Sequence, residues 1–204
     1  MPTFRVVHGS LTDGAEKVLV NASNTGCQLG SGVSGAIRRA CGPGYQAHIL
    51  AALHARFGSS MPPGAVLITD AGTHPHAQYV AHVAVMDYRH GVGADSFPSL
   101  SLIRQSGALL WQELESLRSA APLSVAMVAL GGGTGRLGVR QPTEVICQTL
   151  TEHLNRHRDT LLGQLVFYGY ELPEYLAMVE VVGAHFPLEP GSVSDEVLDY
   201  LKRL

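Results

Sequence analysis

Apolar residues along the chain fall into short runs, and segments with apolar residues at helical spacing separate most of these runs. Runs rich in β-branched residues predict strands at residues 4–7, 17–22, 65–70, 78–86, 124–130 and 165–170. Between these runs, apolar residues at helical spacing, with start and stop residues, predict helices at residues 34–42, 44–58, 101–120, 142–157 and 196–204. One further helix is predicted to start near residue 173. Strands separated by helices predict an α/β fold, a three-layer α/β/α sandwich around a mixed, mostly parallel central sheet.

The length of the chain favours one main domain. Its 204 residues are enough for a single sizeable α/β core. The stretch LEPGSVSD reads as a linker, because Pro, Gly and Ser interrupt the apolar periodicity there. We therefore expect one domain at residues 1–186, followed by a linker and a C-terminal helix at 187–204 that packs on it.

Composition and charge argue against several classes of partner. The chain is 46% hydrophobic and 15% charged, with a formal net charge of -3, so we expect no general nucleic-acid binding and no membrane partner. No apolar run reaches the roughly 18 residues of a membrane-spanning helix, and MPTFRVVHGS lacks the apolar segment of a signal peptide. The three cysteines, Cys27, Cys41 and Cys147, form no CxxC pair and fit a reducing compartment. We expect a cytoplasmic protein.

Two glycine-rich loops, residues 24–32 and 131–138, follow predicted strands. In such folds ligands bind at the carboxyl ends of the strands, so we expect the loops to share one cleft, with Asp87, Arg89 and His90 as candidates for its rim. Glycine lets backbone amides converge on an anion, and a following helix adds partial positive charge. Either loop alone could be an ordinary tight turn, but two together favour a ligand with several polar groups, such as a sugar nucleotide.

The second loop also contains a literal G-x-G-x-x-G at residues 133–138. A dinucleotide-binding fold would need an acidic residue roughly 20 positions later, at the end of the next strand. Glu152 falls within a predicted helix and Glu171 comes too late. A Rossmann-type nucleotide-binding protein is therefore a remote alternative, and the absence of Gly-Lys-Ser/Thr in either loop excludes a P-loop.

Four segments together resemble the macrodomain family. VNASN followed by LGSGVSGAIRRACG is similar to the family signature VNAAN…GGGVDGAI…AAG, and HGSLTD stands where the family usually has GDIT. ALGGGTGRL resembles the second glycine-rich loop of the family, and FYGYELPEYLAMVEVV resembles its last strand and C-terminal helix. The resemblance runs from about Phe4 to about Val182. It implies that residues 1–186 bind ADP-ribose, with the diphosphate between the loops.

The resemblance also implies roles for individual residues. Asn24 matches the last asparagine of the signature and is the catalytic candidate, because its amide could orient both the distal ribose and a water molecule. Asn24 could instead cap the loop, Asn21 is expected to brace it, and Tyr170 lies beside adenine or at the sheet edge. The implied ligand-binding residues are Ser10, Leu11, Asn24, Gly30, Ser31, Gly32, Val33, Gly131, Gly132, Gly133, Thr134, Gly135, Arg136, Leu137 and Tyr170.

Three positions depart from the family pattern. Ser10 stands where the family has its adenine-binding acid. Asp13 could take over the role of that acid, unless Asp13 serves only the turn. Leu137 stands where many relatives carry an aromatic residue over the distal ribose. Ser34 stands where hydrolytic members often have Asp, so the most obvious carboxylate for activating water is missing.

These residues leave catalysis open. We expect binding of ADP-ribose or its derivatives and hydrolysis of an ADP-ribosyl or O-acetyl-ADP-ribose linkage, whereas the alternative is a non-catalytic reader of ADP-ribosylated macromolecules. No cofactor or metal is expected. His153 and His157 lie four apart on a predicted helix without a third ligand, a pattern more typical of a solvated face than of a metal site. His82, within a predicted strand, is expected to be a satisfied core histidine.

Overall fold

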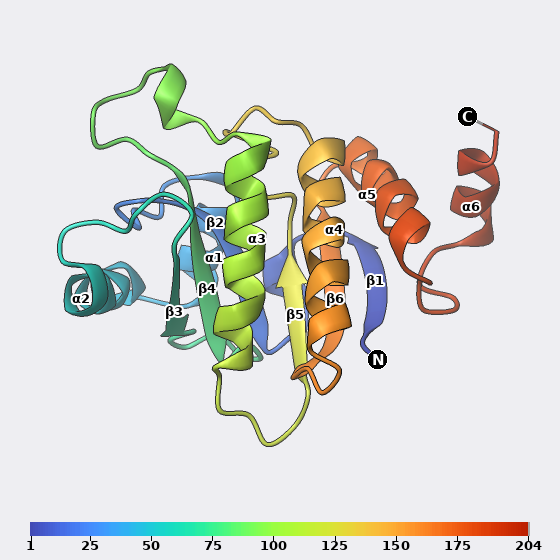
Figure 1. The fold of residues 1–204 in the computed structure, drawn as a ribbon, viewed down its shortest axis with the longest axis horizontal. Helices are drawn as coiled ribbons and strands as arrows, with labels where there is room; N and C mark the ends of the chain where they lie inside the picture. Colours follow the sequence, from blue (N-terminus) through green and yellow to red (C-terminus); the bar gives the residue numbers. More distant parts are fainter. Residues whose placement is uncertain (204) are drawn as a thin grey trace.

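A single six-stranded sheet organises the molecule (Figure 1). The computed structural model describes residues 1–203, the side chain of Ala94 excepted. The strands are β1 (Thr3–His8), β2 (Val18–Asn24), β3 (Val66–Asp70), β4 (Tyr79–Met86), β5 (Leu123–Met127) and β6 (Leu162–Gly169). They lie in the order β1-β6-β5-β2-β4-β3, and every neighbouring pair is parallel except β3 with β4. The predicted mixed, mostly parallel sheet is confirmed.

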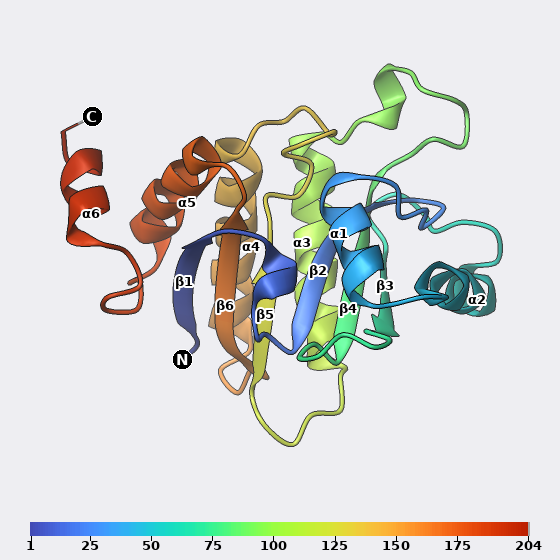
Figure 2. The same cartoon turned by 180° about the vertical axis from the view of Figure 1, so that it is seen from behind.

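Helices cover both faces of this sheet. They are α1 (Gly32–Ala40), α2 (Tyr45–Phe57), α3 (Leu100–Glu115), α4 (Arg140–Arg156), α5 (Leu172–His185) and α6 (Asp195–Leu201), with short 3₁₀ helices η1 (Leu11–Asp13) and η2 (Ala94–Ser96). Figure 1 shows α3, α4 and α5 over one face, and Figure 2 shows α1 and α2 over the other. The three-layer sandwich is therefore confirmed. No helix within residues 1–203 has the length and apolar character needed to cross a bilayer.

Side chains that alternate along the strands belong to two apolar cores, one on each face of the sheet. Val18 and Val20 of β2 belong to the core beneath α3, α4 and α5, which includes Trp111. Leu19, between them, belongs to the core beneath α1 and α2 together with Ile37. Successive strand residues point to opposite faces, and both faces are covered, so β2 has a continuous apolar run.

The parallel strands place five chain segments along one edge of the sheet. β1, β6, β5, β2 and β4 all run in the same direction, so the residues that follow their carboxyl ends emerge side by side. We call this the carboxyl edge; it lies uppermost in Figure 1. Both glycine-rich loops belong to it, because one follows β2 and the other follows β5.

The C-terminal segment lies along the side of the sheet that is formed by the outermost strand β1. The backbone amide of Glu189 donates to the carbonyl of Phe4 at 2.8 Å, and Leu188 forms an isolated parallel bridge with Phe4. Val193 is buried in the core beneath α5, and Val197 of α6 is partly buried against it. The described part of residues 187–204 thus contacts β1 and the core directly.

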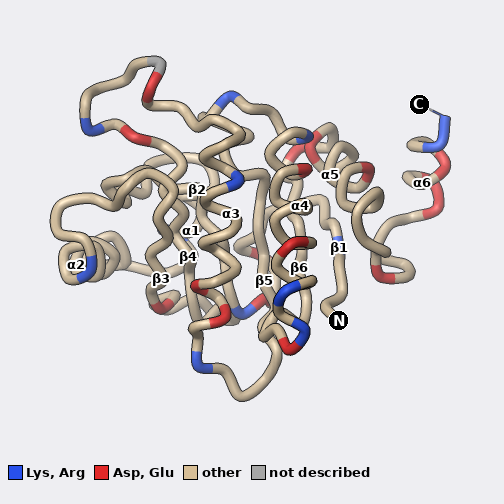
Figure 3. The backbone as a smooth tube through the Cα atoms, viewed as in Figure 1, with Lys and Arg blue, Asp and Glu red and all other residues tan. Residues whose placement is uncertain are grey.

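Charged residues are distributed over the whole chain. Figure 3 shows Lys and Arg positions spread over loops and helices rather than gathered along one element. Several arginines lie beside carboxylates, in the pairs Arg56–Glu113, Arg89–Asp87, Arg104–Glu152 and Arg140–Glu180. Basic and acidic side chains are therefore interspersed over the described residues.

Candidate functional site

The first glycine-rich loop begins at Asn24, whose side chain holds it closed. Oδ1 of Asn24 accepts hydrogen bonds from the amides of Gly26 at 3.1 Å and Gln28 at 3.2 Å, and Nδ2 donates to the carbonyl of Gln28 at 2.8 Å. The side chain therefore caps the loop. Within residues 1–203 the Nδ2 group has this one acceptor, so its second hydrogen can reach a ligand or a water molecule.

The amides at the start of α1 form the first potential anion site. The first helical hydrogen bond runs from the amide of Gly35 to the carbonyl of Ser31 at 3.1 Å. The amides of residues 30–34 donate to no group in the described part of the chain, as is usual for the first turn of a helix. A Cβ on Gly35 would lie 2.8 Å from the carbonyl oxygen of Gly30, so a glycine is needed for the loop to lie this close to α1. Unpaired amides at a helix start attract anions.

The second loop offers a similar set of amides. Its turns are closed by hydrogen bonds from Arg136 to the carbonyl of Gly133 at 2.9 Å and from Leu137 to that of Gly131 at 3.1 Å. Gly131 (φ 80°) and Arg136 (φ 63°) both adopt left-handed backbone conformations. The amides of residues 133–135 have no acceptor among the described residues. Since β2 and β5 are paired neighbours, the two loops emerge from adjacent strands.

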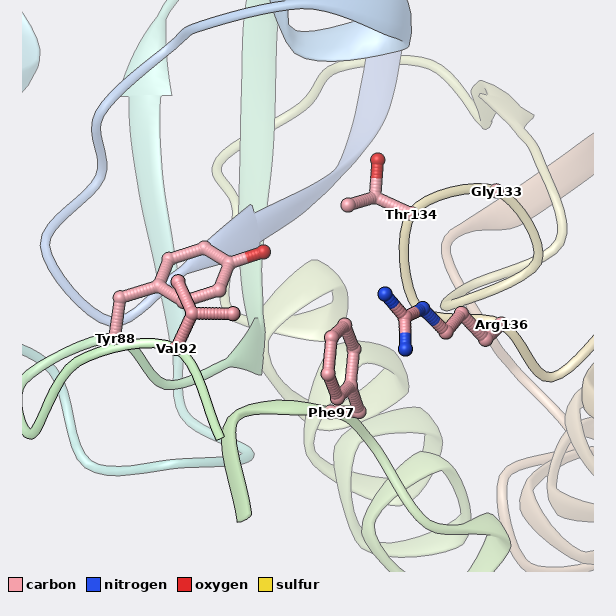
Figure 4. Close-up of a pocket in the computed structure, with 6 residues that line it drawn as sticks. All are labelled: Tyr88, Val92, Phe97, Gly133, Thr134 and Arg136. Atoms are coloured by element: carbon pink, nitrogen blue, oxygen red, sulfur yellow. The ribbon is translucent and has the colours of Figure 1, made fainter. Parts of the chain in front are cut away.

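A hollow of about 470 Å³ lies beside the second loop (Figure 4). Its lining residues are Tyr88, Val92, Phe97, Gly133, Thr134 and Arg136. One wall is the second loop, and the other is the segment between β4 and α3. Residues 30–33 of the first loop do not belong to this lining. The hollow therefore lies between the second loop and the β4–α3 segment, and not between the two glycine-rich loops.

Aromatic side chains and one guanidinium shape the hollow. Cζ of Arg136 lies 4.3 Å from the centroid of the Phe97 ring, which is a cation–π contact. In Figure 4 the ring of Tyr88 points toward the hollow from the opposite side. Val92 is 78% exposed and Tyr88 37% exposed. The loop sequence did not single out Tyr88, Val92 and Phe97 as site residues, although large apolar side chains in a loop rich in Gly, Asp and Ser were an available signal.

Leu137 contributes little to this surface. Its side chain is partly buried against the core beneath α3 and α4, and its Cδ1 would lie 3.3 Å from a Cβ placed on Gly131. The aromatic side chains of the hollow thus come from Tyr88 and Phe97, on the opposite wall.

The predicted rim residue Asp87 has a bridging position. Its Oδ1 accepts from the hydroxyl of Thr25 at 3.1 Å, and its Oδ2 accepts from Nη2 of Arg89 at 2.6 Å. Hydrogen bonds from the Arg89 side chain hold the pKa of Asp87 well below its ordinary value. Asp87 therefore stays ionised and links the first loop to the β4–α3 segment, and its low pKa disfavours a role as general base. His90 is exposed.

At the other end of the carboxyl edge, β1 and β6 bring Ser10 and Tyr170 to adjacent strand ends. Ser10 caps η1, because its hydroxyl accepts from the amide of Thr12 at 3.3 Å and lies 2.8 Å from the Thr12 hydroxyl. Tyr170 is 68% exposed. The side chain of Leu11 is buried in the core beneath α1, so only its backbone can face a ligand.

Ser34 points away from the open edge. Its hydroxyl donates to Oδ1 of Asn21 at 2.9 Å, and Nδ2 of Asn21 lies 3.2 Å from Nδ1 of His82. His82 is fully buried, and that burial, which disfavours the charged form, lowers its pKa to about 3. His82 is thus a neutral core histidine with hydrogen-bond partners, as the sequence predicted, and Asn21 braces the start of α1.

His and carboxylate side chains meet in pairs in the described structure, such as His153 with Glu115. Residues 1–203 contain no group of three His, Cys, Asp or Glu side chains that could hold a metal ion. His153, predicted on a solvated face, is 7% exposed and lies 2.9 Å from Glu115. That prediction was wrong for His153, because its helix faces the end of α3.

Comparison with known proteins places these loops in a family. The sequence model of the Macro domain family matches residues 20–146, a span from β2 into α4 that includes both glycine-rich loops and the β4–α3 segment. The chain belongs to the macrodomain family. The resemblance first seen in the two loop sequences is thereby confirmed for this macrodomain.

Individual relatives cover most of this macrodomain. A protein of Escherichia coli (strain K12) named O-acetyl-ADP-ribose deacetylase is 34% identical over 174 residues, 82% of this chain and 88% of that protein. A Macro domain-containing protein of Streptomyces griseus is 35% identical over 129 residues, 63% of this chain and 66% of that protein. A mutant of the Oceanobacillus iheyensis macrodomain solved with ADPR superposes with a TM-score of 0.73 at 19% identity, covering 90% of this chain and 93% of that one. At that identity the superposition shows the shared fold.

Proposed function

We propose that this macrodomain binds ADP-ribose and its derivatives along the carboxyl edge. The observation that carries the proposal is the pair of amide sets at residues 30–34 and 133–135, which have no acceptors in the described chain and lie in loops from adjacent strands. A diphosphate presents two neighbouring anionic groups, and such amide sets recognise anions without a basic side chain. The solved macrodomain that contains ADPR supports the choice of nucleotide.

The order of the strand ends gives the ligand a direction. Tyr170 and Ser10 follow β6 and β1, the amide sets follow β5 and β2, and Tyr88 follows β4. In our proposal adenine lies against the exposed ring of Tyr170 and the hydroxyl of Ser10, beside the backbone of Leu11. The diphosphate lies at the amides, and the distal ribose lies between Asn24 and the hollow.

The proposed contacts are mainly with the backbone. The amides belong to Gly30, Ser31, Gly32, Val33, Gly133, Thr134 and Gly135, while Gly131 and Gly132 shape the second loop and Leu137 supports it from the core. Arg136 adds a positive charge beside these amides, and its contact with Phe97 restricts where the guanidinium lies.

We also propose hydrolysis of an ester or glycosidic linkage at the distal ribose. The relative named O-acetyl-ADP-ribose deacetylase supports this proposal. Asn24 would orient the ribose and a water molecule through the free hydrogen on Nδ2, and the ligand's own diphosphate would accept the proton that the attacking water loses. The oxygen leaving the ribose or the acyl group then takes up a proton from solvent.

A reader that does not turn over its ligand is the second candidate. Ser34 donates to Asn21 and faces away from the open edge, and Asp87 is held ionised by Arg89. Neither Ser34 nor Asp87 therefore offers the distal ribose a carboxylate of raised pKa. In that case the partner would be an ADP-ribosylated macromolecule that is bound and released unchanged.

Calorimetric titration with ADP-ribose tests the binding proposal. We expect saturable binding of one ADP-ribose per chain and a higher affinity than for AMP, which lacks the second phosphate and the distal ribose. Arg136→Ala should weaken binding about three- to tenfold, or roughly 0.7–1.4 kcal/mol, because it removes one charge near the diphosphate. Absence of heat with millimolar ADP-ribose, from a folded protein, would end the proposal.

A second assay separates the enzyme from the reader. The wild type is incubated with O-acetyl-ADP-ribose and, separately, with a mono-ADP-ribosylated protein, and free ADP-ribose is quantified by chromatography. Release in either reaction supports hydrolysis, whereas binding without release supports the reader. Ser34→Asp should raise the rate, because a carboxylate has two oxygens, so that one can accept from Asn21 while the other faces the distal ribose. If neither form turns over either substrate, catalysis is excluded for both linkages.

A further inference from the structure

We infer that Asn21 and His82 form a buried relay that positions residue 34, and that this relay can satisfy either a hydrogen-bond donor or an acceptor at that position. The relay connects the first turn of α1 to strands β2 and β4 beneath it. The inference concerns residues that the proposed function does not use for contact with the ligand. Only its last test rests on the proposed binding of ADP-ribose.

The outer part of the relay is a chain of two hydrogen bonds. The hydroxyl of Ser34 donates to Oδ1 of Asn21 at 2.9 Å, and it also lies 3.4 Å from the carbonyl of Ala22. Nδ2 of Asn21 lies 3.2 Å from Nδ1 of His82. Both Asn21 and His82 have no exposed surface. An unsatisfied group here would be costly, so each atom needs its partner.

The inner part of the relay ends in two hydroxyl groups. Nε2 of His82 lies 3.3 Å from the hydroxyl of Thr69 and 3.4 Å from that of Tyr45, and these two hydroxyls are 3.0 Å apart. Burial keeps the His82 imidazole neutral, so it carries one N–H and one bare nitrogen. When Nδ1 accepts from Asn21, the proton lies on Nε2 and is donated to one of the hydroxyls.

The same atoms can serve a second arrangement. If residue 34 presents a carboxylate, Asn21 can satisfy it by turning its amide over, so that Nδ2 faces residue 34 and Oδ1 faces His82. His82 then carries its proton on Nδ1 and donates it to Oδ1 of Asn21. Nε2 becomes an acceptor, and the Thr69 or Tyr45 hydroxyl can donate to it, because a hydroxyl does either. Every buried group keeps a partner in both arrangements.

This relay acts on the proposed site through α1. Ser34 belongs to the first turn of the helix, whose amides at residues 30–34 form the first anion site. Holding Ser34 to Asn21 fixes that turn against β2. Asn21 and His82 are therefore positioning residues, since neither is placed in contact with the ligand.

The proton position on His82 tests the relay without any ligand. Nitrogen-15 NMR distinguishes the protonated from the bare ring nitrogen of a neutral histidine, and loss of signals in His82→Gln assigns them. We expect the proton on Nε2 in the wild type and on Nδ1 in Ser34→Asp. Ser34→Ala, which offers neither a donor nor an acceptor, should leave it on Nε2. A proton that stays on Nε2 in Ser34→Asp would overturn the inference.

A double-mutant cycle is a second test of the relay, and it can be used if His82→Gln does not fold. Ser34→Asp should change the melting temperature little when Asn21 is present, because the turned amide satisfies the carboxylate. In the Asn21→Leu background, Ser34→Asp should lower the melting temperature clearly, since residue 21 then has no side-chain amide to satisfy the carboxylate. Equal effects of Ser34→Asp in both backgrounds would contradict the relay.

The positioning role is tested against a matched control. Thr149→Val removes a buried hydrogen bond on the other face of the sheet, where the Thr149 hydroxyl accepts from Nε1 of Trp111 at 3.1 Å. Both Asn21→Leu and Thr149→Val should lower the melting temperature. Only Asn21→Leu should weaken ADP-ribose binding, by about tenfold. Equal affinities of both folded variants would reject positioning, whereas a wild type that does not bind ADP-ribose would reject the proposed function and leave the NMR result standing.

Discussion

Two glycines of the second loop show how differently single residues contribute to the site. A Cβ on Gly135 would lie 2.5 Å from the carbonyl oxygen and 2.6 Å from the Cα of Gly131, and these backbone atoms cannot move aside cheaply. A Cβ on Gly133 would meet nothing within 4 Å. Gly135 is therefore required for the loop to close on itself, and Gly133 is not.

Substituting each glycine by alanine tests this difference. We expect Gly135→Ala to destabilise the protein by about 1–3 kcal/mol, a cost typical of overpacking, and to weaken ADP-ribose binding because the amides of residues 133–135 move apart. Gly133→Ala is the control and should melt within a degree or two of the wild type. Thermal unfolding and calorimetry measure the two effects, and a Gly135→Ala protein as stable as Gly133→Ala would contradict the close approach.

Ser34 shows what a motif predicts about a residue and what it does not. The signature identified its place in the first helical turn. The direction of its side chain depends on Asn21 and, through it, on His82, and the last two lie 61 positions apart in the chain. Because only the pairing of β2 with β4 brings those two together, no local pattern could predict the relay.

At the scale of elements, the carboxylate of Glu115 connects three parts of the fold by hydrogen bonds. Glu115, the last residue of α3, accepts hydrogen bonds from the Thr160 hydroxyl, from the Leu161 amide at 2.9 Å and from Nε2 of His153 at 2.9 Å. It thereby joins the end of α3 to α4 and to the segment that enters β6. Burial alone would raise the pKa of Glu115, but these hydrogen bonds hold it below its ordinary value of 4.5.

The lowered pKa of Glu115 predicts a pH dependence of stability. A carboxyl group with a depressed folded pKa stabilises the protein above its unfolded pKa, and that contribution is lost as the pH falls through the folded pKa. The free energy of unfolding of the wild type should therefore exceed that of Glu115→Gln at pH 7, and the difference should shrink below about pH 4.5. Denaturant titrations between pH 3 and 7 measure it.

Glu152→Gln is the control, because Glu152 forms an exposed pair with Arg104 at 2.9 Å. Exposed ion pairs contribute little, so this variant should follow the wild type across the same pH range. A difference for Glu115→Gln that stays constant from pH 7 to 3 would show that its hydrogen bonds do not depend on ionisation.

The boundaries of elements differ from the sequence prediction for local reasons. α4 begins at Arg140 rather than at Pro142, because a proline is tolerated in the first turn, where the amides lack helical partners. β5 ends at Met127 rather than at residue 130, since the chain turns there and the Gly132 amide donates to the carbonyl of Ala129 at 3.0 Å. β2 extends to Asn24 through an irregular pairing at Ser23.

On the scale of the whole molecule, the described C-terminal residues form part of the sheet border. We propose that residues 187–204 stabilise the domain without contributing to its site. Removing them should lower the melting temperature, since each buried aliphatic side chain lost, such as Val193, costs about 1.5–3 kcal/mol, and β1 loses its contact with Glu189. The affinity for ADP-ribose should stay within about twofold of the wild type.

A shorter deletion separates the linker from α6. Removing residues 195–204 alone takes away only partly buried or exposed side chains among those described, so it should lower the melting temperature much less. Equal losses from both deletions would place the stabilisation in α6. A large loss of affinity in either deletion would show that the segment reaches the site.

The fold class and the two loops could be predicted from the sequence, because strand and helix periodicity and glycine-rich turns are local signals. The hollow could not be predicted from the sequence. Tyr88, Val92 and Phe97 are brought to the second loop by the parallel placement of β4, two strands away from β5 in the sheet. Its position depends on strand order, which the order of residues in the chain does not reveal.

The carboxyl edge also has a defined length. Four inter-strand steps separate β1 from β4, and at about 4.8 Å each they span roughly 19 Å. In the proposed binding mode, a nucleoside monophosphate at Tyr170 would cover only the first part of that length and would leave the amides after β2 in water. We therefore expect a molecule that matches the full row of strand ends to bind more tightly than a shorter molecule that carries the same groups.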